Sequence, residues 1–152
     1  MGYTTTALVT NVARNIEIAN GKVSSMLPTQ ANQFIDEAEQ IIDSRLSSLY
    51  YVPLRQITRS NSDGENETTF PPPIPFIATR IAAALMVRAV YSRIDVQTSE
   101  NADAHFKDAT DELNDLADGA TVGSRRLAGQ TLKAMTPFLN PSAAPLEPPK
   151  RG

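Results

Sequence analysis

The sequence predicts an all-α fold: a small bundle of three main helices plus a short N-terminal helix, a polar loop or β-hairpin insert, and an extended C-terminal tail. Two observations lead to this prediction. Apolar residues recur every three or four positions along three long segments, which gives a helix one apolar face. Between and after these segments, proline, glycine and polar residues form stretches that interrupt helices. The length of 152 residues suits one domain.

The first two helices are predicted in the N-terminal third of the chain. Any of the residues at 4–6, all threonine, can cap a short helix that continues to Ile16. A longer helix is expected from Thr29 to about Tyr50. Its apolar stripe comprises Phe34, Ile35, Ala38, Ile41, Ile42, Leu46 and Leu49. Its other face carries Asp36, Glu37, Glu39, Asp43 and Arg45. The stripe requires a partner helix.

Residues 55–72 form the predicted insert. The stretch 60–69 is almost free of apolar residues and contains the turn dipeptide Asp63-Gly64. The runs 55–59 and 67–70 can pair across this turn as a ribbon, which is marginally stable alone. Contacts in an oligomer would order such a ribbon. The candidate inter-subunit or tail-side contacts in this loop are Arg55, Arg59, Asp63, Gly64 and Phe70.

The other two main helices follow the insert. From Ile74 to about Ile94, apolar residues cover most of the helix circumference, so this helix is expected at the centre of the bundle. Prolines immediately before and within its first turn fix where it starts. The next helix is expected to be capped by Thr98 or Ser99 and to stop at Gly119.

The bundle is expected to span residues 1–123, and residues 124–152 are expected to form a proline-rich docking tail. Four apolar side chains stand out in this otherwise polar tail, which suggests that they bind another surface. These candidate interface residues are Leu132, Met135, Phe138 and Leu139.

Composition argues against several classes of function. The 14 basic residues are outnumbered by 17 acidic ones, whereas a strong duplex binder concentrates basic residues on one face. The chain has no cysteine, so disulfides and thiolate metal sites are excluded. We expect a soluble, unprocessed protein without a membrane partner, because no secretory signal and no run of about 20 apolar residues is visible.

No catalytic constellation is apparent. His105 is the single histidine and has no metal-ligand spacing around it. The acidic residues between Asp108 and Asp118 lie along one predicted helix, where a solvated face explains them better than a cation site. No phosphate-binding glycine loop is present. We therefore expect a non-enzymatic protein with no catalytic residues, metal or cofactor.

The order of several short motifs resembles a known family. Tyr3-Thr-Thr-Thr opens the chain, Tyr50-Tyr51-Val52-Pro53-Leu54 ends the second helix, and Pro73-Ile74-Pro75 precedes an alanine-rich helix. A final helix runs through Asp111-Glu112-Leu113 to Gly119. This succession, from about residue 3 to 123, resembles the head-to-tail connector (adaptor, or head completion) proteins of tailed bacteriophages. The insert at 61–69 and the tail beyond 129 depart from that pattern.

The resemblance implies a structural virion protein in the neck, at the head-tail junction, made in the host bacterial cytoplasm. It implies a homo-oligomeric ring, typically twelvefold, beneath the portal protein. Genomic DNA would only pass through its lumen, and a stopper, terminator or tail-tube protein would dock below. The alternative is a small helical regulatory or nucleic-acid-binding protein. Its basic patch would comprise Arg80, Arg88, Arg93, Arg125 and Arg126.

Overall fold

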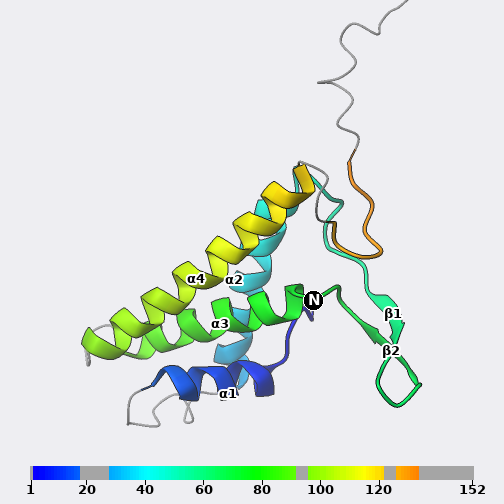
Figure 1. Ribbon diagram of the computed structural model, residues 1–152. Helices are drawn as coiled ribbons and strands as arrows, with labels where there is room; N and C mark the ends of the chain where they lie inside the picture. The colour runs from blue at the N-terminus through cyan, green and yellow to red at the C-terminus, as the bar shows by residue number, and fades with distance from the viewer. Residues whose placement is uncertain (1, 18–27, 92–95, 122–125, 134–152) are drawn as a thin grey trace, which may run out of the picture.

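The computed structural model describes residues 2–17, 28–91, 96–121 and 126–133. Figure 1 shows that these residues form a helical bundle with one hairpin beside it. The elements are α1 (Thr6–Ile16), α2 (Pro28–Leu46), β1 (Ile57–Ser60), β2 (Asn66–Thr69), α3 (Ile74–Tyr91) and α4 (Val96–Thr121). The predicted helical bundle with a hairpin insert is confirmed. Most of the predicted tail lies outside the described residues.

Helix α3 forms the centre of the bundle and packs against α1, α2 and α4 (Figure 1). Its prediction as the central helix is confirmed, because buried side chains occur on every side of it. They are Ile74, Ile77, Ala78, Thr79, Ile81, Ala82, Ala83, Ala84, Met86, Val87 and Tyr91. Tyr91, at its end, donates a hydrogen bond to Glu17 after α1 (Oη to Oε1, 2.7 Å). The three surrounding helices thus share one core.

By length and composition alone, α3 is apolar enough to cross a membrane, with a mean hydropathy of 1.5 over its 18 residues. In the structure, 61% of this helix is buried inside the protein. A core helix surrounded by other helices has the same composition as a membrane span. Packing within the bundle therefore accounts for most of the apolar surface of α3.

Helix α2 presents its predicted stripe to the core, where Ile35, Ala38, Ile42 and Leu46 are buried. The helix ends at Leu46 rather than at about Tyr50. The amides of Leu49 and Tyr50 both donate to the Leu46 carbonyl at 2.9 Å. The chain therefore turns at this point, and both residues remain buried without being helical.

Glu39 was expected on the charged face of α2 but is only 5% exposed. Its Oε2 accepts hydrogen bonds from the backbone amides of Gly2 (2.7 Å) and Tyr3 (2.8 Å). Charge-assisted bonds of this kind offset the desolvation of a buried carboxylate. Glu39 therefore holds the N-terminal segment against α2.

Tyr3 is the second contact that holds the N-terminal segment. Its hydroxyl donates to Asp43 Oδ1 (2.6 Å) and accepts from the Leu54 amide (2.8 Å). Burial, and then the hydrogen bond to Asp43, raise the pKa of Tyr3 far above its ordinary value. After Tyr3, Thr5 caps α1 by accepting from the Leu8 amide, which confirms one of the predicted threonine caps.

Helix α4 is longer than predicted at both ends, because it begins at Val96 and continues to Thr121. Thr98 is fully buried in its first turn rather than capping it. Gly119 lies within the helix, whereas it was expected to end it. A single helical glycine costs about 1 kcal/mol. This cost does not end a long helix that packs along α3.

Replacement of the fully buried Ile42 by aspartate should unfold the protein. The new carboxylate would be buried without a partner, at a cost of several kcal/mol, which is about the whole stability of a small domain. Circular dichroism during urea unfolding should show lost or greatly reduced cooperativity for Ile42→Asp. Gln33→Asp, at an exposed position of α2, is the control and should change stability by less than about 0.5 kcal/mol. A folded, cooperative Ile42→Asp protein would contradict the assignment of the core.

The pH dependence of the free energy of unfolding should reveal the raised pKa of Asp43. Burial raises the pKa of its carboxyl above the ordinary 3.8, the Tyr3 hydrogen bond opposes this, and the charge of Glu39 adds to it. The resulting stabilisation is complete below pH 3.8 and is lost as the pH rises through the raised pKa. Urea unfolding at pH 4 and pH 7 should therefore show wild type gaining relative to Asp43→Asn at the lower pH.

Asp43→Asn keeps an oxygen that accepts from the Tyr3 hydroxyl, so the comparison isolates the titration of the carboxyl. Asp36→Asn removes an exposed carboxylate from the same helix and serves as the control. An Asp43→Asn effect that is constant between the two pH values would show that the carboxyl has its ordinary pKa in the folded protein.

Candidate assembly surfaces

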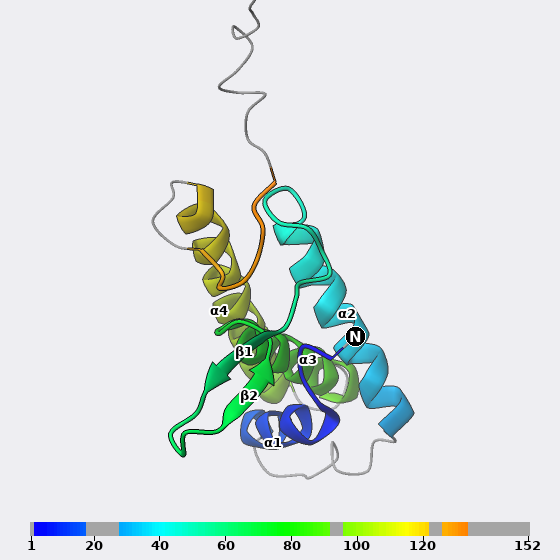
Figure 2. The same ribbon diagram turned by 90° about the vertical axis from the view of Figure 1, so that its right-hand side faces the viewer.

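The hairpin of β1 and β2 is the most exposed element of the structure. Figure 1 shows the hairpin projecting from the helices, and Figure 2 shows β1 running toward its tip and β2 running back. The strands are antiparallel, with Thr58 opposite Thr68 and Arg59 opposite Glu67. Ile57 and Thr69, at the base, are half-buried, and the remaining side chains of both strands are exposed. Within the described residues this sheet has two strands, so both of its outer edges are available for pairing.

The tip of the hairpin is organised by Asn61. Its side-chain Oδ1 accepts from the amides of Asp63 (2.9 Å) and Glu65 (3.1 Å). Its backbone carbonyl accepts from Gly64, which has a positive φ of 83°. This conformation favours glycine and completes a short hairpin loop. Sequence reasoning identified Asp63-Gly64 but missed Asn61, although an asparagine two residues before a turn aspartate is a recognisable signal.

Phe70 was predicted to belong to the exposed loop, and the structure corrects this. It is 7% exposed and packs edge-to-face against Tyr3, with ring centroids 4.7 Å apart. An aromatic ring that follows a polar ribbon can bury its area against the bundle, and here it does so. The other candidates of the loop, Arg55, Arg59, Asp63 and Gly64, are exposed.

Residues 126–133, which the sequence places in the tail, pack on the bundle of their own chain. The side chain of Gln130 forms two hydrogen bonds with the backbone of Arg55: its Oε1 accepts from the amide (2.8 Å) and its Nε2 donates to the carbonyl (2.7 Å). Leu127 is buried, and its amide donates to the Tyr50 hydroxyl (3.1 Å). Leu132 is half-buried against the core and forms a backbone bridge with Tyr50.

Leu132 is thus in contact with its own subunit. The other candidate interface residues of the tail, Met135, Phe138 and Leu139, lie outside the described residues.

Gly129 brings this segment against the base of the hairpin. It has a positive φ of 72°, and a β-carbon at this position would overlap the Cγ2 atom of Ile57. Both the backbone conformation and the close approach therefore require glycine. The sequence contains no local signal for this contact.

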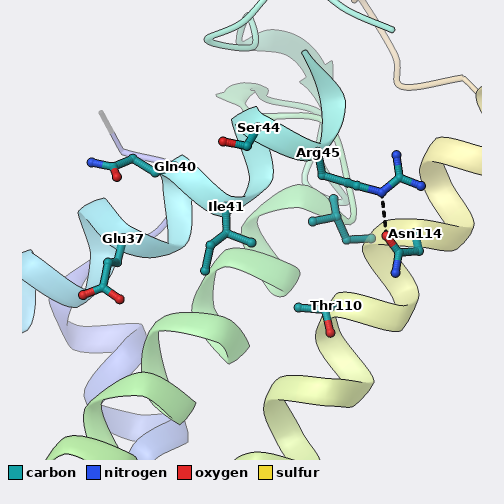
Figure 3. A pocket seen from close by; sticks show the side chains of 8 residues that line it. Glu37, Gln40, Ile41, Ser44, Arg45, Thr110 and Asn114 are labelled. Atoms are coloured by element: carbon teal, nitrogen blue, oxygen red, sulfur yellow. Dashed lines mark hydrogen bonds between the residues drawn. The ribbon is translucent and has the colours of Figure 1, made fainter. Parts of the chain in front are cut away.

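A groove lies between α2 and α4, and sequence reasoning missed it. Its volume is about 590 Å³, and it is lined by Glu37, Gln40, Ile41, Ser44, Arg45, Thr110, Leu113 and Asn114. Figure 3 shows Ile41 and Thr110 directed into the space between the two helices. At one end, Arg45 Nε donates to Asn114 Oδ1 (2.6 Å), and the guanidinium also lies 3.5 Å from Asp118. Arg45 therefore joins the two helices across the groove.

The arginines proposed for a nucleic-acid-binding patch are largely engaged. Arg80 lies 3.8 Å from both Asp108 and Glu112, and Arg88 lies 3.0 Å from Asp103. Each guanidinium also lies over an aromatic ring, that of Phe76 or Phe106. Arg126 is exposed, while Arg93 and Arg125 lie outside the described residues. Carboxylates of α4 thus offset the positive charge of α3.

His105 and the acidic face of α4 show no catalytic geometry. His105 is half-buried, and its Nδ1 has no hydrogen-bond partner in the described part of the chain. On α4, Asp108, Asp103 and Asp111 form ion pairs with Arg80, Arg88 and Lys107, respectively. Among the described residues, no group of three His, Asp or Glu side chains is placed to hold a metal ion.

The pairing of Arg59 with Glu67 gives a test of the hairpin. Arg59→Glu would place like charges opposite each other and destabilise the ribbon by about 0.2–1 kcal/mol. Hydrogen exchange of the strand amides should become faster, with the helix amides unchanged. The double variant Arg59→Glu/Glu67→Arg restores an opposite-charge pair and should return exchange to the wild-type rate. Equal exchange in both variants would show that the cross-strand pair does not stabilise the hairpin.

Comparison with known proteins gives one family match. Residues 4–134, most of the chain, match the family described as Bacteriophage Mu, Gp36. No curated protein and no solved structure gives a significant match. The matched range includes the whole bundle, the hairpin and the segment 126–133, and it ends before Met135. The chain therefore belongs to the Bacteriophage Mu Gp36 family and is a bacteriophage protein.

Proposed function

We propose that this chain is a non-enzymatic structural protein of the virion, a head-to-tail adaptor. It assembles as a ring under the portal, extends the DNA channel, and provides the docking surface for a stopper or another tail protein. Membership of a bacteriophage family over residues 4–134 supports a phage role for almost the entire bundle. The resemblance of its motifs to connector proteins supports the neck as the location.

The single observation that carries the proposal is the exposed hairpin. Its strands have four residues each, and most of their side chains are exposed. An isolated ribbon of this size is marginally stable in water. Its base is nevertheless fixed to the bundle through Phe70, Gln130 and Gly129. A ribbon with a fixed base and free edges is suited to contacts between adjacent subunits of a ring.

The charge of α4 supports a role in lining a channel. Exposed carboxylates occur along the helix, and they are Glu100, Asp103, Asp108, Asp111, Asp115 and Asp118. Ion pairs with Arg45, Arg80, Arg88 and Lys107 offset part of this negative charge. The six carboxylates outnumber these four cations, so the face would still repel the phosphate backbone and let DNA slide past. The ion pairs of Arg80 and Arg88 also reduce the basic surface that the regulatory alternative requires. The adaptor role is thus favoured over nucleic-acid binding.

Light scattering of the purified protein, with and without portal assemblies of the same phage, tests the proposal. We expect a ring, or a smaller species that becomes a ring on the portal. A species that ignores portals but shifts DNA in a gel, with strong salt dependence, would favour the regulatory alternative instead.

A matched pair of variants tests the hairpin's part in this assembly. Arg59→Ala removes one exposed cation from the hairpin, and Lys107→Ala removes one from α4. Neither change affects the core. Arg59→Ala should lower the fraction of chain found in rings, and Lys107→Ala should leave it unchanged. Equal ring yields for both variants would assign ring formation to a surface other than the hairpin.

A further inference from the structure

The charges of the hairpin are separated by strand. β1 and the two residues before it carry Arg55 and Arg59 and no acidic residue. β2 and the residue before it carry Glu65 and Glu67 and no basic residue. All four side chains are exposed. Arg59 lies opposite Glu67, yet the ion pairs within the described residues involve neither of them. The β1 edge of the ribbon is therefore basic and the β2 edge acidic.

We propose that the hairpin pairs edge to edge with the hairpin of a second copy of this chain, with β1 of one copy antiparallel to β2 of the next. The inference deepens the proposed function, on which it rests, by naming the strands that meet and their polarity. A head-to-tail contact of this kind uses a different edge on each side of the subunit. Its repetition leads from one subunit to the next, as a ring requires.

The backbone of the ribbon has hydrogen-bonding groups directed outward. The Asn61 amide donates to the Glu65 carbonyl (2.8 Å), which makes these two residues a hydrogen-bonded pair. Such pairs alternate with non-hydrogen-bonded pairs along an antiparallel ribbon, so Arg59 and Glu67 also bond to each other's backbone. The residues of the intervening pairs direct their amides and carbonyls to the outer edges, and they are Thr58, Ser60, Asn66 and Thr68.

Both edges are accessible beyond the base of the hairpin. Within the described residues, no third strand pairs with β1 or β2. The segment 126–133 contacts the β1 side at the base, where Gln130 bonds to Arg55 and Gly129 approaches Ile57. These contacts hold the ribbon in one orientation relative to the bundle. An edge that is already ordered loses little conformational entropy when another strand pairs with it.

Charge determines which strand of the second copy pairs with β1. Contact of β1 with β1 would bring two copies of Arg59 together, and contact of β2 with β2 would do the same for Glu67. Like charges on adjacent strands are destabilising, whereas opposite charges stabilise. Charged residues on edge strands generally prevent pairing between copies. Here their separation by strand disfavours both symmetric pairings and favours the head-to-tail one.

The contact between two hairpins is small. Strands of four residues bury much less surface than the roughly 1,000 Å² expected of a stable interface. The pairing is therefore weak between free chains and stronger where other surfaces hold adjacent subunits together. Covalent trapping is the suitable method, because it accumulates a weak contact.

Disulfide trapping in the full-length chain tests the polarity, because the chain has no cysteine of its own. A concentrated mixture of Thr58→Cys and Thr68→Cys chains should form a mixed disulfide dimer under mild oxidation. Asn66→Cys replaces Thr68→Cys for a register shifted by two residues. Each variant alone should form disulfide dimers no faster than Ala104→Cys, which has an exposed cysteine on α4 and measures random collision.

Two results of the trapping experiment would contradict the proposal. Faster dimer formation by Thr58→Cys alone or by Thr68→Cys alone would indicate symmetric pairing. Mixed dimers at the rate of the Ala104→Cys control, in both registers, would show that the edges do not pair.

Charge reversal gives matched variants for the same trapping assay. Arg59→Glu makes positions 59 and 67 both acidic, and Glu67→Arg makes both basic. When both cysteine-bearing chains carry the same reversal, the mixed dimer should be lost. When one carries Arg59→Glu and the other Glu67→Arg, the dimer should be recovered, because opposite charges meet again between copies. The repulsion within each hairpin persists in this mixture, so recovery reports on pairing between copies, and absent recovery would overturn the proposal.

These experiments use free chains without portals, so they separate the pairing from the adaptor role. Trapping in the expected pattern, combined with light scattering that is indifferent to portals, would support the pairing and contradict the adaptor role. Rings on portals without the expected trapping would support the adaptor role and overturn the pairing.

Discussion

The burial of α3 among three other helices is the constraint on which the rest of the fold depends. Its buried side chains occur on every side of the helix, and α1, α2 and α4 cover them. The buried hydroxyl of Thr79 is satisfied by donating to the Pro75 carbonyl (2.7 Å) and by pairing with Thr4. That pairing places the N-terminal segment beside α3, where Tyr3 and Glu39 then hold it. The surrounding helices and the N-terminal segment thus all take their positions from contacts with α3 or with α2 beside it.

The sequence predicted the features that depend on periodicity and turn chemistry, which are the helices and the hairpin. It failed where a residue's environment depends on distant parts of the chain. Glu39 was assigned to an exposed face because its neighbours on α2 are charged, yet its partners lie 36 and 37 residues away. Phe70 adjoins a polar insert, and its burial follows from Tyr3. The contact of Gln130 with Arg55 spans 75 residues and has no local signal.

The assembly surfaces and the core are closely connected in this molecule. The hairpin extends from the bundle, but its base touches Tyr3 through Phe70 and the segment 126–133 through Ile57. Residues near both ends of the described chain therefore hold the hairpin in one orientation. In a ring, a defined orientation lowers the conformational entropy that each subunit loses when its neighbour binds. Folding of the subunit and geometry of the proposed interface thus rest on the same contacts.

The close approach of Gly129 to Ile57 also limits how the protein can evolve. A larger residue at position 129 would require both a strained backbone and a smaller side chain at position 57, and a single substitution cannot supply both. The two positions are therefore expected to change together or not at all among relatives, while the exposed strand positions vary freely. Sequence drift could then alter which partner the hairpin recognises without altering the angle at which the hairpin leaves the bundle.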